Sequence, residues 1–302
     1  MAFSHSKVFL ALTALIGVSV LAATRPSGGL VENTGSRPTP ERALADLPAG
    51  VAGSFQVITY NIAGLPDFLS RSHPSVNVPH MGPLLSDYDI ALVQEDFAYS
   101  EQLSHRVSLP FKSDPWAGGL LEMGDGLNRF SRLPFLELHH EPWNACNGYF
   151  TDRNDCLAAK GFSTAIHYLG QNTMVEVYNL HMDAGITPAD RKARLAQVKQ
   201  LLAALREYSS HRAVIVAGDT NLWSEDKMTL RDLLQAAGLR DTCEVAGCPE
   251  KQRDRDKILY RSGQDLELTP MDWRVDHRFV DEEGRALSDH QPIAVKFHWK
   301  SL

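Results

Sequence analysis

The sequence predicts an α+β sandwich, because strand-like runs and helix signals interleave without the regular alternation of βαβ units. Short runs rich in Val, Ile and aromatic residues, typical of buried strands, occur at 55–62, 89–93, 174–180, 213–217 and 293–297. Neither a GxGxxG nor a GxxxxGK[ST] string is present in the chain. Together these observations exclude a doubly wound nucleotide-binding sheet.

The clearest helix signal lies between two of these runs. Thr187 can cap a helix, Pro188 suits its first position, and Asp190 lies where the helix dipole favours an acid. The apolar side chains that follow at helical spacing are Leu195, Val198, Leu201, Leu202 and Leu205. We expect this apolar face to pack on a sheet.

The N-terminal part of the chain predicts export. Residues 1–23 have the layout of a secretory signal peptide, with Lys7 before a long apolar run that ends in small residues. An uncleaved N-terminal anchor is the alternative. Residues 24–53 are rich in Pro, Gly and polar residues and predict a flexible leader, followed by one domain over 54–302. We expect a secreted protein, extracellular or periplasmic.

Composition limits the class of function. The chain has 302 residues, of which 43% are hydrophobic, and a formal charge of -7. Such a composition excludes a disordered or collagen-like chain. The acidic total argues against binding of nucleic acid by net charge alone, although it leaves a local basic groove open.

The four cysteines fit an oxidising compartment. Cys146 and Cys156 are ten residues apart, and Cys243 and Cys248 are five apart. Two local disulfides are therefore the economical choice among the three possible connectivities. No CxxC string occurs, which argues against a zinc site.

Polar residues of related chemistry recur where the predicted strands end. They are Asn61, Glu95, His181, Asp219, Asn221, Asp289 and His290. A rigid sheet presents side chains at its strand ends to one shared mouth. Carboxylates, amides and imidazoles suit a hard, oxygen-ligated divalent cation beside an acid/base pair. We therefore expect Mg²⁺, with Mn²⁺ or Ca²⁺ as alternatives.

Six short motifs contain most of these residues. They are TYNIAGLP (59–66), VQED (93–96), YNLHMDAG (178–185), AGDTN (217–221), DRDKILY (254–260) and LSDHQP (287–292). In this order they resemble the motif series of the endonuclease/exonuclease/phosphatase superfamily. The resemblance implies a four-layered α/β sandwich, with two packed mixed β-sheets flanked by helices as in deoxyribonuclease I. It also implies hydrolysis of a phosphate ester with a divalent metal.

The resemblance assigns a metal-binding group. Asn61 and Glu95 match the positions that bind Mg²⁺ in the superfamily, with the carboxylate holding the ion against a phosphate oxygen. Asp289 is expected to add to the metal site or to the hydrogen bonds around it.

The resemblance also assigns the catalytic group. His290 matches the general base that activates water, and Asp256 matches the carboxylate that orients its imidazole. His181 is expected to donate to the phosphoryl oxygens. Asp219 and Asn221 are expected to position the water and the scissile phosphate.

The sequence offers two candidates for the carboxylate that orients His290. The superfamily string around the orienting carboxylate has a bulky residue before the Asp, whereas this chain has Arg255 before Asp256 and Lys257 after it. Asp276, in RVDHRF, is the competing candidate for the residue that orients His290.

Two local features favour a lipid substrate. Asn61 is followed by Ala-Gly-Leu-Pro, and 155–162 read DCLAAKGF; both are similar to segments of secreted bacterial-type sphingomyelinases. A sphingomyelin-type phospholipid is therefore the favoured substrate, with possible contact at a membrane surface, and we expect a monomer. The loop 144–159 is expected either to border the substrate mouth or to be only a braced surface loop.

Two other functions are kept as alternatives. The first is a deoxyribonuclease I-like endonuclease acting on DNA, for which Arg129 and Arg132 are candidates for a phosphate groove. The second is a catalytically inactive module that uses the same cleft for binding.

Overall fold

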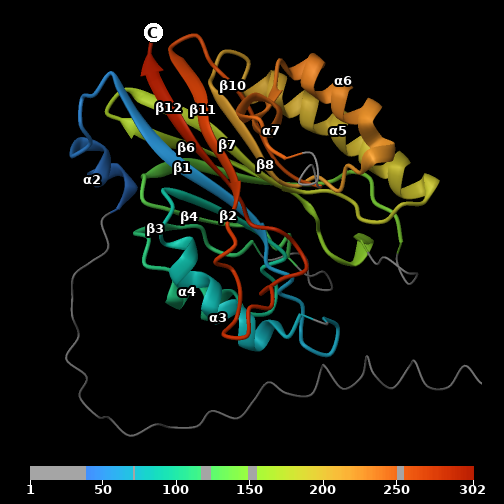
Figure 1. Ribbon diagram of the computed structural model, residues 1–302. Helices are drawn as coiled ribbons and strands as arrows, with labels where there is room; N and C mark the ends of the chain where they lie inside the picture. Colours follow the sequence, from blue (N-terminus) through green and yellow to red (C-terminus); the bar gives the residue numbers. More distant parts are fainter. Residues whose placement is uncertain (1–38, 71, 117–123, 149–154, 250–254) are drawn as a thin grey trace, which may run out of the picture. The chain divides into compact units, whose positions relative to one another are not determined.

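Two mixed β-sheets pack against each other at the centre of the protein (Figure 1). The structure, a computed structural model, describes residues 39–70, 72–116, 124–148, 155–249 and 255–302. Within these residues each sheet has six strands, in the orders β11-β12-β1-β2-β4-β3 and β5-β6-β7-β8-β10-β9. The pair β1/β2 and the pair β7/β8 are parallel, and the other neighbouring strands are antiparallel.

The strands have the following bounds. The first sheet contains β1 (Ala52–Asn61), β2 (Ile90–Gln94), β3 (Phe111–Lys112), β4 (Asn128–Ser131), β11 (Leu266–Val275) and β12 (Ile293–Ser301). The second contains β5 (Phe135–Pro142), β6 (Gly161–Gly170), β7 (Thr173–His181), β8 (Val214–Asp219), β9 (Arg240–Asp241) and β10 (Asp256–Arg261). All five predicted strands are therefore present, with their ends moved by a few residues.

Helices cover the outer faces of both sheets (Figure 1). Helices α3 (Pro74–Leu85) and α4 (Ser100–Arg106) pack on the first sheet, and α5 (Pro188–Tyr208) and α6 (Lys227–Ala237) pack on the second. The remaining short helices are α2 (Pro40–Ala45), α7 (Thr242–Ala246), η1 (Asp155–Leu157) and η2 (Ser224–Asp226). The layers run helix, sheet, sheet, helix, which confirms the predicted four-layered sandwich.

Strand alternation assigns successive side chains to different layers. In β1, Val57 faces the second sheet, whereas Ile58 faces α3 and α4, and both are fully buried. Burial of such a side chain contributes about 1.5–3 kcal/mol to the free energy of unfolding. Because both faces of the central strands are covered, these strands are apolar on both sides, as the sequence runs predict.

Helix α5 begins as predicted and buries most of the predicted apolar face, with Val198, Leu201 and Leu205 in the core and Leu202 packed against it. Thr187 caps it, accepting from the backbone N–H of Asp190, and the Asp190 carboxylate accepts from the backbone N–H of Thr187 in return. Leu195, expected in the apolar face, is 39% exposed. Arg194 is buried instead, because its guanidinium reaches the carboxylate of Asp226 at 2.9 Å. The buried side of the helix therefore includes Arg194 and leaves Leu195 exposed.

Folded structure begins earlier than we expected from the leader prediction for 24–53. Thr39 caps α2 within that range, and Pro40 starts the helix, which is the arrangement that favours a helix N-terminus. Strand β1 begins at Ala52, where it pairs with Lys300 of β12. The predicted signal peptide and the leader up to residue 38 lie outside the described residues. In the described part of the chain, no helix is long and apolar enough to span a membrane.

The two parallel pairs determine where the functional side chains lie. Parallel neighbours end at the same edge of a sheet, so Asn61 of β1 lies opposite Gln94 of β2. In the second sheet, His181 of β7 lies opposite Asp219 of β8, which lies opposite Asp256 of β10. Strand register therefore places these residues side by side within each sheet, and the packing of the two sheets brings the two groups together.

Candidate active site

A cavity at this edge brings the predicted residues together. The sequence predicts eight site residues, and six of them line this cavity: Glu95, His181, Asp219, Asn221, Asp289 and His290. The other two, Asn61 and Asp256, are buried directly behind the lining and hydrogen-bond to it. Residues 184–186, Trp223 and Arg255 complete the wall. Side chains from both sheets thus share one small polar space.

Asn61 links two of the carboxylates. Its Nδ2 donates to Glu95 Oε1 at 2.9 Å and to Asp219 Oδ2 at 3.2 Å. Its Oδ1 accepts from the backbone N–H of Ala63 at 3.0 Å. In this arrangement Asn61 positions the carboxylates of Glu95 and Asp219, and its own amide oxygen is engaged by the backbone.

His181 lies against the same two carboxylates. Its Nε2 is 3.4 Å from Asp219 Oδ2 and 3.8 Å from Glu95 Oε1, and the side chain is 1% exposed. Burial lowers the pKa of His181 well below its ordinary value, and the positive charge of Lys160 lowers it further. The Nε2 of His181 faces the cavity and the two carboxylates, so a proton on this nitrogen can be donated there.

His290 is held from behind by Asp256. Its Nδ1 is 2.9 Å from Asp256 Oδ2 and 3.1 Å from Asp256 Oδ1, and its Nε2 is 3.7 Å from Asp219 Oδ2. Burial by itself lowers the pKa of His290, but the charges of Asp256 and Asp219 outweigh burial and raise it to about 9. The Oγ of Ser288 accepts from the His290 backbone N–H at 3.2 Å and donates to the carbonyl of Asn61 at 2.7 Å. The imidazole is thereby fixed relative to β1.

Asp276, the competing candidate, has different partners. It accepts from the hydroxyl of Tyr88 at 2.6 Å and from the guanidinium of Arg278 at 2.6 Å. Burial raises its pKa, but hydrogen bonds from Arg278 and Tyr88 outweigh burial and lower it to about 2. Asp256, and not Asp276, contacts His290.

The remaining two predicted residues differ in their surroundings. Asn221 lies directly after the Asp219 turn, where its backbone N–H donates to Asp219 Oδ1 at 3.0 Å. Its Nδ2 donates to the carbonyl of Met182 at 3.1 Å. Asp289 is exposed at the rim of the cavity. Asn221 therefore shapes the turn that holds Asp219, and Asp289 meets solvent.

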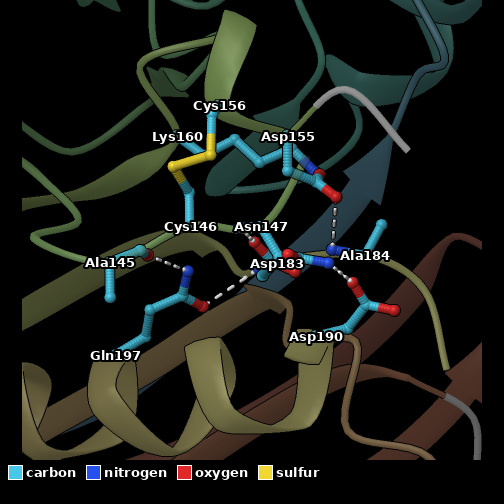
Figure 2. The surroundings of a disulfide bond; sticks show 10 residues. All are labelled: Ala145, Cys146, Asn147, Asp155, Cys156, Lys160, Asp183, Ala184, Asp190 and Gln197. Atoms are coloured by element: carbon cyan, nitrogen blue, oxygen red, sulfur yellow. Dashed lines mark hydrogen bonds and ion pairs between the residues drawn. A yellow bond between two sulfur atoms is a disulfide. The ribbon is translucent and has the colours of Figure 1, made fainter. Parts of the chain in front are cut away.

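The disulfide loop supports one wall of the cavity. Cys146 and Cys156 form the predicted disulfide, and Asp155, next to it, accepts from the backbone N–H of Ala184 at 3.1 Å (Figure 2). Lys160 forms an ion pair with the same carboxylate. Because Ala184 lines the cavity, the described part of loop 144–159 contacts the cavity wall.

A second set of contacts holds the same segment from the helix side. Asn147 donates its backbone N–H to Asp183 Oδ2 at 2.7 Å and its Nδ2 to Asp190 Oδ1 at 2.6 Å (Figure 2). Gln197 of α5 accepts from the backbone N–H of Asp183 at 3.0 Å. Burial and the nearby charge of Asp155 raise the pKa of Asp183 to about 7. The loop, the wall segment and α5 thus form one connected unit.

Arg129 and Arg132 do not line the cavity as a nuclease-like phosphate groove would require. Arg129 is buried between the sheets, where it donates to the Oγ of Ser163 at 2.9 Å and to the carbonyl of Val177 at 3.1 Å. Arg132 pairs with Asp89 at 3.1 Å. Neither side chain lines the cavity described above. The structure contradicts this prediction because Arg129 points into the sandwich.

Sequence reasoning missed Arg255 and Trp223 as cavity residues. The Arg255 guanidinium lies over the Trp223 ring, with Cζ 5.1 Å from its centroid, and Nη2 is 2.8 Å from His290 Nε2. The departure from the superfamily string at Arg255 was the signal that could have identified it. Nothing in the sequence around Trp223 indicates that its ring would lie under a guanidinium.

The donor set fits a hard divalent cation. Glu95 and Asp219 offer carboxylate oxygens to the cavity from the two sheets, and the Asp219 carboxylate lies within 4.8 Å of ligand atoms of Asp256 and His290. All four cysteines are in disulfides, Cys146–Cys156 and Cys243–Cys248, as predicted. With thiolates absent from the site, oxygen-preferring ions such as Mg²⁺ suit it better than zinc.

Solved structures share this fold. Humanized D. rerio TDP2 has a TM-score of 0.63 at 21% identity, over 81% of this chain and 98% of that one. Sphingomyelinase C from Streptomyces griseocarneus has a TM-score of 0.58 at 18% identity, over 81% and 99%. Beta toxin from Staphylococcus aureus with bound magnesium ions has a TM-score of 0.58 at 15% identity, over 80% and 99%. These likenesses define the fold as the deoxyribonuclease I-like sandwich.

No family model matches the chain. Curated relatives nevertheless identify its family. A sphingomyelinase of Mycobacterium tuberculosis (strain ATCC 25618 / H37Rv) is 34% identical over 275 residues, covering 82% of this chain and 54% of the relative. A putative neutral sphingomyelinase of Drosophila melanogaster is 28% identical over 236 residues, covering 74% and 51%. The chain spans about half the length of these relatives. It belongs to the sphingomyelinase family of the endonuclease/exonuclease/phosphatase superfamily, which confirms the predicted resemblance.

Proposed function

We propose that this chain is a divalent-metal-dependent phosphodiesterase that hydrolyses sphingomyelin-type phospholipids. The observation that carries the proposal is the convergence of Glu95, His181, Asp219 and His290 from both sheets on one cavity. The 34% identity to a sphingomyelinase supports the lipid substrate. The magnesium ions in the beta toxin structure support Mg²⁺ as the metal.

His290 acts as the general base in this proposal. Its Nε2 takes a proton from the attacking water, and Asp256, at 2.9 Å from Nδ1, stabilises the imidazolium that forms. Water adds to phosphorus while the bond from phosphorus to the ceramide oxygen breaks. The leaving alkoxide takes up a proton from solvent water and His290 releases its proton to solvent, so the products are phosphocholine and ceramide.

The carboxylates and His181 hold the phosphate group. A bound divalent cation supplies positive charge against a phosphate oxygen, and Glu95 and Asp219 are the residues that would hold it. Asp256 and Asp219 raise the pKa of His290, which strengthens its imidazole as a base. Neutral His181 donates from Nε2 to a phosphoryl oxygen. Asn61 keeps both carboxylates in place through its Nδ2.

A side-by-side assay tests this function. Purified protein is incubated in Mg²⁺ with sphingomyelin vesicles and, separately, with plasmid DNA. We expect phosphocholine release without nicking, loss of release in EDTA, and no release by His290→Asn, with Asp272→Asn as an exposed control. Nicking without phosphocholine would establish the endonuclease alternative instead. Absence of turnover on any diester, with the biological effect retained in His290→Asn, would establish the inactive binding module.

We also propose that the protein is exported and that its substrate mouth meets a lipid surface. The two disulfides support an oxidising compartment. Phe68 and Leu69 are 80% and 60% exposed on the loop that follows β1, the strand that ends in Asn61. Binding of Phe68→Ser/Leu69→Ser to sphingomyelin vesicles should be weaker than wild-type binding in a flotation assay. Unchanged flotation would contradict this role of the loop.

A further inference from the structure

Arg255 occupies a defined position at the mouth of the catalytic cavity. Its backbone carbonyl accepts from the N–H of Thr220 at 3.1 Å and from the Thr220 hydroxyl at 2.6 Å. Its guanidinium lies over the ring of Trp223, a cation–π arrangement with Cζ 5.1 Å from the ring centroid. Both ends of the residue are therefore supported by the turn that follows Asp219.

The guanidinium also contacts the atom proposed to bind the attacking water. Arg255 Nη2 is 2.8 Å from His290 Nε2 and, because a guanidinium only donates, the two form a hydrogen bond only when Nε2 carries no proton. A general base must instead accept from water at that nitrogen. The Arg255–His290 contact and the reaction therefore exclude each other, and the guanidinium has to leave Nε2 during turnover.

An anion entering the cavity gives the guanidinium a better partner. Guanidinium groups bind phosphate oxygens through short, charge-assisted and often paired hydrogen bonds. The cavity wall around Arg255 is otherwise acidic, with Glu95, Asp219 and Asp289 lining it. Arg255 is the arginine in that lining, so it is the side chain there that can neutralise a phosphate oxygen on the rim side.

We propose that Arg255, supported by Trp223, binds a non-bridging oxygen of the substrate phosphate and that the phosphate draws its guanidinium away from His290 Nε2. The proposal deepens the proposed function and rests on it for the identity of the substrate. It makes Arg255 a substrate-binding residue of this chain at the position where the chain departs from the superfamily string.

Phosphate binding without turnover tests the proposal directly. Binding of phosphocholine is measured by titration calorimetry in EDTA for wild type, Arg255→Lys, Arg255→Gln and Arg285→Gln. Loss of charge-assisted hydrogen bonds should raise the Kd of Arg255→Gln by about 10- to 100-fold. Arg255→Lys should fall between it and wild type. Arg285 is an exposed arginine outside the cavity, so Arg285→Gln should bind as wild type does.

Equal affinity of Arg255→Gln and wild type, or no measurable binding by wild type, would overturn the proposal. Thermal unfolding of each variant separates lost binding from lost folding. In Mg²⁺, hydrolysis of sphingomyelin in mixed micelles should show a larger rise in KM than fall in kcat for Arg255→Gln. If sphingomyelin is not cleaved at all, the proposed function fails, while the calorimetry still decides whether Arg255 binds phosphate.

Discussion

The side-chain amide of Gln94 donates to Oδ1 of Asn179 at 2.7 Å, across the interior between the two sheets. Both residues are fully buried. Gln94 directly precedes Glu95, and Asn179 lies two residues before His181. Asn179 also donates to the carbonyl of Val93 at 3.0 Å. This connection fixes the strand that presents the carboxylate relative to the strand that presents the imidazole.

Removal of this connection should lower both stability and activity. Asn179→Ala leaves Gln94 and the Val93 carbonyl without their buried partner, which costs about 1–3 kcal/mol in the free energy of unfolding. Urea denaturation measures that cost, and kcat should fall because Glu95 and His181 are no longer held in register. Gln171→Ala, at an exposed turn, is the matched control. A variant with normal kcat would show that the connection is only structural.

Asp256 should be essential to the rate and not to substrate binding. Asp256→Asn removes the charge that stabilises the His290 imidazolium, so kcat is expected to fall by about 100-fold or more with little change in KM. The pKa of His290, followed by NMR in the metal-free protein, should fall as well. An unchanged His290 pKa would contradict the assignment of their contact.

Asp276 should affect stability in acid and leave the rate unchanged. Its folded pKa of about 2 lies below the unfolded value of about 3.9, so its contribution is present above pH 4 and is lost as pH falls toward 2. Asp276→Asn should therefore be less stable than wild type at neutral pH, and the difference should shrink between about pH 4 and pH 2. Denaturation curves across this range measure the effect. A large fall in the kcat of Asp276→Asn at neutral pH would instead indicate that Asp276 takes part in catalysis.

Glu95 should determine the metal requirement. Glu95→Gln keeps a hydrogen-bond acceptor for Asn61 but loses the charge, so the Mg²⁺ concentration for half-maximal activity should rise by about tenfold or more. Mg²⁺ should also raise the melting temperature of wild type and have less effect on the variant. Equal Mg²⁺ dependence in the two proteins would place the metal away from Glu95.

The two disulfides should differ in their effect on activity. Cys146→Ser/Cys156→Ser frees the loop whose Asp155 holds Ala184 at the cavity wall, so both stability and kcat/KM should fall. The loss in the free energy of unfolding is expected to be about 2–3 kcal/mol. Cys243→Ser/Cys248→Ser is the matched control and should retain kcat/KM, because Cys243 lies in α7, Cys248 follows that helix, and neither residue lines the cavity. Equal kcat/KM in the two variants would show that the loop with Cys146 and Cys156 does not support the active site.

The site was predictable because its residues follow buried strands. Asn61, Glu95, His181 and Asp219 each come at or just after the end of a strand that apolar runs identify. Parallel register brings these strand ends together within each sheet, and the packing of the two sheets brings both groups to one cavity. The helix after Thr187 was equally clear from its cap.

The unpredicted features depend on contacts between segments far apart in the chain. The Gln94–Asn179 connection joins residues 85 positions apart, and neither residue differs locally from an ordinary polar residue in a strand. Arg129 shows the same limit, because its burial depends on acceptors supplied by Ser163 and Val177. The sequence alone does not distinguish an arginine that has hydrogen-bond acceptors inside the sandwich from an arginine at the surface.

The backbone at Glu95 has a φ of 57°, in the left-handed region that disfavours side chains other than glycine. A residue held there costs about 1–2 kcal/mol relative to an ordinary conformation. Glycine would relax the backbone and remove the carboxylate that faces Asn61 and His181. The carboxylate that the proposed metal site needs is therefore carried by a strained residue, so selection for thermal stability alone would favour glycine here and would remove that carboxylate.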